Sequence, residues 1–192
     1  MNVHELKDQE LINEYLKGSD RAFEILLNRH RDKIYTSIYL FVKDTDLAND
    51  IFQDVFIKIV KTLRKGKYNH EGKFLQWAMR IAYNMCVDNF RRSKRRTKVS
   101  ASETFDIFDI LESKDENMET KIIKSQIHEK VRALVDQLPP EQREVVILRH
   151  YADMSFKEIS QLTRVSINTA LGRMRYALIN MRKMANEKEM VA

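Results

Sequence analysis

The chain has 192 residues, a length that fits one or two small domains and excludes a large multidomain enzyme. Apolar residues make up 43% of it, too many for a wholly disordered chain, and its 4 glycines and 2 prolines are too few for the turns of an all-β fold. The net charge of +6 indicates a polyanionic partner only if the basic residues cluster, and the single cysteine, Cys86, excludes an intramolecular disulfide and a cysteine-based metal site.

The first residues, MNVHELKDQELINEYLKG, contain no apolar core of signal-peptide type, and no later stretch is apolar over the width of a bilayer. The sequence therefore predicts a cytoplasmic protein with no membrane insertion of its own. A short helix is predicted here, near Asp8 to Leu16.

Two longer amphipathic helices are predicted between Asp20 and Leu63, because apolar residues recur there at helical spacing. The polar run Lys43-Asp44-Thr45 separates them. Beside the apolar stripe of the second helix, polar side chains share one face: Asp46, Asp50, Gln53, Asp54 and Lys58. On its own this pattern leaves two interpretations open, a solvated face and a docking surface.

A polar loop with two glycines, RKGKYNHEGK over 64–73, leads into a third helix predicted over about 74–92. Its apolar side is expected to bury Phe74, Ala78, Ile81 and Met85. On the polar side, residues follow one another at spacings of four and three: Arg80, Asn84, Asp88, Arg91 and Arg95. Two roles are open for Trp77, a core residue or a stacking surface for nucleic-acid bases.

The composition changes abruptly after this helix. Six Lys and Arg residues lie between positions 91 and 98, and in the following SASETFDIFDILESKDENMET seven acids face one lysine. No helical period crosses that segment, which predicts a flexible acidic linker over 97–120.

A helical pattern resumes near Lys121, with apolar residues on one face: Ile123, Ile127, Val131, Leu134 and Leu138. Pro139 ends this helix, and Pro140 suits the first turn of the next, EQREVVILRHY.

The remaining residues predict a helix-turn-helix. Ser155 and Glu158 form a capping box before a helix that turns Phe156, Ile159 and Leu162 inward, and Ser166 can cap the second helix. The apolar stripe predicted for that second helix consists of Ile167, Ala170, Leu171, Met174, Leu178 and Met181. Polar positions lie opposite, at Asn168, Thr169, Gly172, Arg173, Tyr176 and Lys183, with Arg175 on the flank.

The charge of this unit indicates a nucleic-acid partner. No acid occurs between Thr163 and Asn186, whereas arginines and a lysine recur, which suits phosphate, and Asn, Thr and Arg side chains suit base edges. Gly172 costs about 1 kcal/mol relative to alanine inside a helix, so its presence on the polar face indicates close approach of DNA to the backbone. An ordinary amphipathic hairpin with a solvated basic face remains the alternative.

The predicted fold is therefore all-α, with two small helical domains joined by the flexible acidic linker. The first domain spans 5–96, the linker 97–120, and the second domain, with the helix-turn-helix, 121–186.

Several stretches together resemble the extracytoplasmic function (ECF) group of bacterial sigma factors. DRAFEILLNRHRDKIY and LANDIFQDVFIKIVKTL resemble the first two helices of the family's region 2, and FLQWAMRIAYNMCVDNFRR resembles its promoter-melting helix. LPPEQREVVILRHYADMSFKEIS and VSINTALGRMRYAL resemble region 4. The resemblance covers nearly the whole length, and it implies a sigma factor that brings core RNA polymerase to promoters, without catalysis, cofactor or metal of its own.

The resemblance also implies roles for individual residues. Because the second helix of region 2 docks on the polymerase clamp in the family, the expected polymerase contacts are Asp46, Asp50, Gln53, Asp54 and Lys58. The expected −10 contacts are Tyr68, Asn69, His70, Trp77, Arg80, Asn84, Asp88, Arg91 and Arg92, with the loop residues placed to hold a flipped base. The expected −35 contacts are Ser166, Asn168, Thr169, Gly172, Arg173, Arg175 and Tyr176.

The implied partners are core RNA polymerase, through its β and β′ subunits, promoter DNA, and an anti-sigma factor, which is often membrane-bound in the family. In the family the linker passes through the polymerase channel that later carries RNA, and the acidic FDIFDILE suits such a channel, with a plain spacer as the alternative. Arg164 stands where relatives often have glycine, and Leu171 and Gly172 where lysine and serine are common, so the resemblance does not extend to a particular −35 sequence.

The sequence disfavours two other classes of function. An autonomous helix-turn-helix regulator usually dimerises across two half-sites, and the sequence offers no obvious dimerisation helix. A metal-dependent nuclease using Asp44, Asp46, Asp50 and Asp54 is disfavoured, because the histidines are scattered and no phosphate loop or HExxH pattern occurs.

Overall fold

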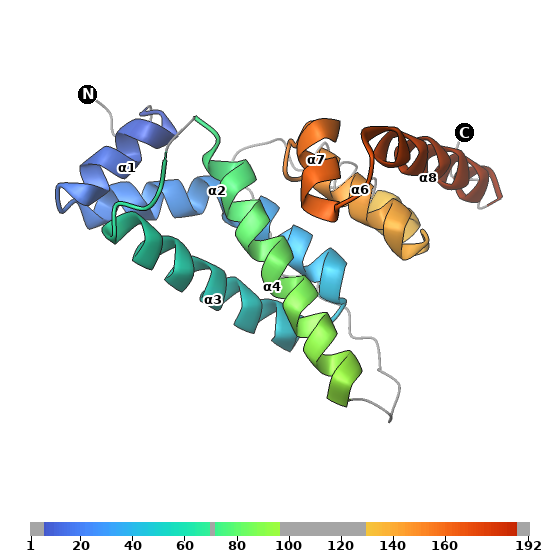
Figure 1. Ribbon diagram of the computed structural model, residues 1–192, viewed down its shortest axis with the longest axis horizontal. Helices are drawn as coiled ribbons and strands as arrows, with labels where there is room; N and C mark the ends of the chain where they lie inside the picture. The colour runs from blue at the N-terminus through green and yellow to red at the C-terminus, as the bar shows by residue number, and fades with distance from the viewer. Residues whose placement is uncertain (1–5, 70–71, 97–129, 188–192) are drawn as a thin grey trace, which may run out of the picture. The chain divides into compact units, whose positions relative to one another are not determined.

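The computed structural model describes residues 6–69, 72–96 and 130–187. Within these ranges every regular element is a helix, which confirms the all-α prediction. The predictions for His70, for the linker 97–120 and for the start of the helix near Lys121 lie outside the described residues. The helices divide between two compact units, the first with α1–α4 and the second with α6–α8 (Figure 1).

The first unit consists of α1 (Asp8–Leu16), α2 (Asp20–Val42), α3 (Thr45–Arg64) and α4 (Phe74–Arg96). α2 packs against the other three helices (Figure 1). The centre of the unit is filled by branched apolar side chains at helical spacing. The fully buried ones include Leu26, Ile34, Ile38, Ile59 and Leu63. The predicted boundaries between the helices are confirmed.

A tight connection joins α2 to α3. Lys43 ends α2 in the left-handed conformation, with φ 55°, and its amide donates to the carbonyl oxygen of Tyr39 at 2.7 Å. Asp44 then caps α3, because its carboxylate accepts a hydrogen bond from the Leu47 amide at 2.9 Å. Asp44 is therefore a structural cap at the start of α3, and it does not extend the acidic face of that helix.

The burial of α4 differs slightly from the prediction. Phe74 and Ala78 are buried as expected, but Ile81 and Met85 are only half-buried. The rest of the buried face is formed by Leu75, Met79, Ala82, Tyr83 and Cys86. The inner face is thus rotated by about one residue, which leaves Ile81 and Met85 at its border. Burial also raises the pKa of the Cys86 thiol to about 12.

The short helix α1 is fastened to α2 by ionic hydrogen bonds. The Asp8 carboxylate accepts from Arg29 Nη1 at 2.7 Å and lies 2.8 Å from His30 Nε2. The His30 ring in turn lies against Phe74 at the start of α4, with ring centroids 5.4 Å apart. Burial alone would raise the pKa of Asp8, but the hydrogen bonds and charges of His30 and Arg29 outweigh it and lower that pKa.

The second unit contains a helical segment over residues 130–136, α6 (Pro140–His150), α7 (Phe156–Thr163) and α8 (Ile167–Glu187). Pro140 opens α6, as predicted. One core cluster joins Val135 and Leu138 to Val146 of α6 and Ala177 of α8, and Met174, Met181 and Met184 pack against it. This cluster fixes the inner face of α8.

The apolar stripe predicted for α8 is wrong in part. Ala170 and Ala177 are buried and the three methionines pack on the core, but Ile167, Leu171 and Leu178 are each more than 40% exposed. The buried residues repeat at spacings of three and four, so the stripe is a narrow one, centred on small and flexible side chains. Leu171 and Leu178 each follow a buried alanine by one position and lie outside this narrow stripe.

Candidate nucleic-acid and protein interfaces

The start of α8 is built by local hydrogen bonds. Ser155 caps α7 in a full capping box, in which the Glu158 amide donates to Ser155 Oγ at 3.3 Å and the Ser155 amide donates to the Glu158 carboxylate at 2.8 Å. Ser166 caps α8, because its Oγ accepts from the Thr169 amide at 3.0 Å and also bonds the Thr169 hydroxyl at 2.8 Å. Both predicted caps are therefore present.

The turn between the two helices requires a left-handed residue, and Arg164 supplies it. Its φ of 58° and ψ of 40° lie in the region that glycine adopts without strain, and its amide donates to the Ser160 carbonyl oxygen. The usual turn geometry is thus kept without the usual glycine. The exposed Arg164 side chain also adds a positive charge beside the start of α8.

The residues predicted to contact duplex DNA fall into two groups on α8. Exposed positions are Ser166, Asn168, Thr169, Arg175 and Tyr176, whereas Gly172 and Arg173 are half-buried. A Cβ added at Gly172 would meet no atom within 4 Å apart from those of its own turn of α8. The glycine therefore serves no internal packing, and it leaves the α8 backbone open to a partner from outside.

Arg173 has a partner on α6. Its Nη1 lies 3.4 Å from a carboxylate oxygen of Glu144, and both side chains are about three-quarters covered. A shallow groove runs beside this pair, lined by Glu141, Gln142, Thr169, Gly172, Arg173 and Tyr176. Asn180 and Gln142 form a second bridge between the same helices at 2.8 Å. Glu144 was not predicted from the sequence, because its neighbour on α8 is far away along the chain.

A polar face of α4 carries most of the predicted −10 contacts. Arg80, Asn84, Asp88, Arg91 and Arg92 are all exposed. The carboxylate of Asp88 and the guanidinium of Arg91 lie 3.8 Å apart, in a pair that remains open to solvent. Arginines at intervals along one helix face suit a phosphate backbone.

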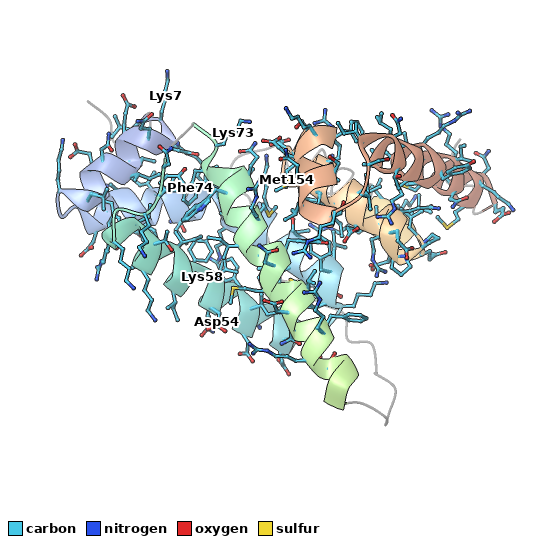
Figure 2. The ribbon with its side chains drawn as sticks, in the orientation of Figure 1. Lys7, Asp54, Lys58, Lys73, Phe74 and Met154 are labelled. Atoms are coloured by element: carbon cyan, nitrogen blue, oxygen red, sulfur yellow. The ribbon has the colours of Figure 1, made fainter. Side chains whose placement is uncertain are left out.

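Trp77 and Tyr68 form an aromatic cluster at the base of the 64–73 loop. Their ring centroids lie 4.3 Å apart, and Phe74 lies 5.9 Å from Trp77 and 6.3 Å from Tyr68. Trp77 and Tyr68 are half-buried, whereas Asn69 is exposed. Trp77 is therefore compatible with both interpretations, because its ring packs on the domain as a core residue does and part of it remains exposed for stacking. Phe74, labelled in Figure 2 at the start of α4, anchors the cluster to the core.

The outer face of α3 is polar with one exception. Asp46, Asp50, Gln53, Asp54 and Lys58 are all exposed, as predicted, and Figure 2 marks Asp54 and Lys58 along this helix. Ile57 lies on the same face, three or four residues from Gln53 and Asp54, and is 50% exposed. Sequence analysis missed it, although helical spacing from Asp50 and Asp54 already places it among the polar positions.

The described residues contain neither a metal-binding cluster nor a membrane-spanning helix. No cluster of three or more His, Cys, Asp or Glu side chains there is arranged to hold a metal ion. None of the described helices is long and apolar enough to cross a membrane.

Comparison with protein families gives two matches in the order predicted. Residues 26–96 match Sigma-70 region 2, and residues 128–175 match Sigma-70 region 4. The RNA polymerase sigma-H factor of Pseudomonas aeruginosa is 29% identical over 171 residues, covering 87% of this chain and 88% of that protein. The ECF RNA polymerase sigma factor SigW of Bacillus subtilis is 24% identical over 169 residues, covering 86% and 89%.

Solved structures share the fold. The sigma factor RpoE of Bartonella quintana, in complex with the anti-sigma factor NepR, matches with a TM-score of 0.63 at 16% identity, covering 85% of this chain and 96% of that one. CnrH, in complex with the cytosolic domain of CnrY, matches with a TM-score of 0.60 at 20% identity, covering 95% and 99%.

Proposed function

The chain belongs to the ECF group of bacterial sigma factors, and we propose that its two domains divide the work of directing core RNA polymerase to specific promoters. The proposed domains are residues 5–96 and 121–186, with 97–120 as the linker. The observation that carries the proposal is the presence of both regions, in order, on one chain that spans most of its relatives' length. In this proposal the chain has no catalysis of its own and works in the cytoplasm, where the polymerase works.

The first domain is proposed to bind polymerase and open the −10 element. The exposed carboxylates of α3, with Gln53 and Lys58, would contact the clamp of the β′ subunit, and we add Ile57 to this surface. An apolar side chain ringed by polar ones is the usual composition of a binding hot spot. This proposal explains why the only large apolar side chain that is half-exposed on α3 lies among its acids.

Capture of the −10 strand is proposed for α4 and the loop before it. Single-stranded DNA is held by stacking on aromatic rings within a basic groove, and Arg80 and Asn84 follow Trp77 on α4 by three and seven residues, which is helical spacing. Tyr68 packs on Trp77, so its role in this proposal is to form the wall of a base pocket, with Asn69 free to reach the base edge. His70 and the arginines at 91 and 92 complete the proposed −10 surface.

The second domain is proposed to read the −35 duplex with α8. Tyr176 and Asn168 are exposed for base contacts, and Arg175 and Arg164 for phosphate. An anti-sigma factor is a further proposed partner. This is supported by RpoE, which shares the fold of this chain and is in complex with the anti-sigma factor NepR. An autonomous regulator is the second candidate, and the same experiment tests it.

The experiment is reconstitution of the purified chain with bacterial core polymerase. Co-elution on size exclusion, followed by transcription from a library with randomised −35 and −10 positions, is the expected result. The transcripts would also give the two promoter sequences. Failure to co-elute, together with tight duplex binding by the chain alone, would favour the autonomous regulator.

A further inference from the structure

Arg173 differs from the other arginines of the helix-turn-helix in having an acidic partner. Arg164 and Arg175 are exposed, whereas the Arg173 side chain is 25% exposed and its Nη1 lies 3.4 Å from Glu144 on α6. A guanidinium paired with a carboxylate carries little net charge toward a phosphate. The pair is therefore a poor phosphate clamp, although Arg173 lies on the helix that would face DNA.

The geometry leaves Arg173 able to bond a second acceptor. Guanidinium has five N–H donors in a planar fork, and a single carboxylate engages at most two of them. Arg173 lines the groove between α6 and α8, beside the open space at Gly172. A base edge that entered next to Gly172 would thus meet an arginine whose orientation is already set from behind.

We propose that Glu144 is a positioning residue that holds the Arg173 guanidinium in one orientation, so that Arg173 reads one base pair of the −35 duplex. The inference rests on the proposed function of α8. The base that fits best is guanine, because its O6 and N7 accept two parallel hydrogen bonds from a planar fork. A fixed guanidinium discriminates better than a mobile one, since less side-chain freedom is lost on binding the correct base and a wrong base cannot be met by another rotamer.

The test uses the full-length chain bound to core polymerase and a promoter library randomised over the −35 region. Four variants are compared with the original protein: Glu144→Gln, Arg173→Ala, Arg173→Lys and the double variant Glu144→Gln/Arg173→Ala. Glu144→Gln keeps the shape of the side chain and removes its charge. The matched control is Glu187→Gln, which removes a carboxylate from an exposed ion pair with Lys183 at the end of α8, away from the residues that line the groove.

Glu144→Gln and Arg173→Ala are expected to weaken the preference for the same single base pair, each by roughly tenfold. The double variant should lose no more than Arg173→Ala alone, because the two residues act as one unit. Arg173→Lys should lose the preference as well, since it keeps the charge without the planar fork. Glu187→Gln should leave the preference intact.

Two results would overturn the inference. In the first, Glu144→Gln leaves the base preference unchanged while Arg173→Ala removes it, which would show that Glu144 does not orient the arginine. In the second, Arg173→Ala weakens initiation equally on all −35 sequences, which would make Arg173 a phosphate contact. Either result would leave the proposed function standing if Asn168→Ala or Tyr176→Ala still changes the −35 preference. If none of the variants changes the −35 preference, the result would count against both the role of Glu144 and the proposed function of α8.

Thermal unfolding of each variant separates orientation from folding. The Glu144–Arg173 pair is partly exposed, so its loss should change stability only modestly. A variant that unfolds before it can be assayed is replaced by Glu144→Asp, which keeps the charge and shortens its reach. Glu144→Asp is expected to show a partial loss of preference at that same base pair, and an unchanged preference would contradict the inference.

Discussion

At the scale of single residues, Gly172 lowers the stability of α8 and leaves the helix surface open at that position. Glycine inside a helix costs about 1 kcal/mol relative to alanine, and at Gly172 an added methyl group would meet nothing in the chain. Gly172→Ala should therefore stabilise the second domain by about that amount in thermal or urea unfolding. On polymerase, the same variant should weaken recognition of the −35 duplex, because the methyl group would keep the backbone away from DNA. Unchanged recognition would show that nothing approaches α8 at this position.

Arg164 allows a similar separation of folding from binding. A side chain in the left-handed region costs about 1 kcal/mol relative to glycine, so Arg164→Gly should stabilise the fold by up to that amount. It should also remove one phosphate contact, which lowers the slope of log affinity against log salt by about one unit. The measurements are unfolding of the free chain and titration of a −35 duplex at several salt concentrations.

Lys43 supplies the control for Arg164. It ends α2 with the same backbone conformation, at φ 55°, but it belongs to the first domain. Lys43→Gly should give a comparable gain in stability with no change in the salt dependence of −35 binding. A change in that slope for both variants would show that the effect comes from net charge alone.

At the scale of elements, the attachment of α1 depends on the charge of Asp8. Hydrogen bonds and charges from His30 and Arg29 lower its pKa despite its burial, so the carboxylate is stabilised in the folded state. This stabilisation is fully present above the unfolded pKa of about 4 and is lost as pH falls through the lower folded pKa. Asp8→Asn should therefore lower the melting temperature at neutral pH, and the difference from the original protein should shrink as pH falls below about 4.

The control for Asp8 is Glu14→Gln. Glu14 pairs with Lys17 at 2.8 Å, but both side chains are well exposed, and such pairs contribute little. Its melting temperature should follow that of the original protein throughout the pH range. An Asp8→Asn difference that stays constant down to pH 2 would contradict the ionic account of α1 docking.

Local signals in the sequence predicted the helices well. The signals that act only on the nearest backbone predicted boundaries and caps that are confirmed. They are Lys43-Asp44-Thr45, Pro139-Pro140 and the Ser155 capping box. The inner face of α8 was predicted less well, because Leu171 and Leu178 were placed on it and Ala177 was not. Close packing against α6 favours the small side chains, and that preference exists only once both helices are placed.

The candidate interfaces divide in the same way. Positions that depend on the phase of one helix, such as Asp50, Asp54 and Arg80, are exposed as predicted. Two contacts between distant parts of the chain were not predicted from the sequence. Glu144 meets Arg173 across 29 residues, and Tyr68 of the loop packs on Trp77 of α4. These contacts set the orientations of the Arg173 and Tyr68 side chains, which cannot be read from the sequence alone.

At the scale of the whole molecule, the two domains would provide separate DNA-binding surfaces on one chain, as proposed above. Each surface alone is small, and a single helix-turn-helix without a dimer partner binds duplex weakly. Polymerase would hold both surfaces near their elements, so that the second contact becomes intramolecular and its effective concentration replaces bulk concentration. If polymerase binds through α3, as proposed, that binding would control promoter recognition by both domains.

The outer face of α3 gives the corresponding prediction. Ile57→Ala should weaken binding to core polymerase by tenfold or more, as expected for truncation of an apolar anchor worth about 1–3 kcal/mol. Because Ile57 is 50% exposed, the variant should fold with almost unchanged stability. Leu16→Ala is the matched control, since Leu16 is a 52% exposed apolar residue on α1 of the same domain. Affinities are measured by competition of labelled and unlabelled chain for core polymerase.

Charge reversal on the same face distinguishes an apolar anchor from an electrostatic one. Asp50→Lys/Asp54→Lys should abolish polymerase binding with the helices intact by circular dichroism, because like charges would meet at the interface. The loss caused by Ile57→Ala should change little with added salt, whereas the contribution of Asp50 and Asp54 should decline as salt screens it. Retained binding by both variants would exclude this face of α3 as the polymerase contact, and −35 and −10 recognition would then have to be coupled through another surface of the first domain.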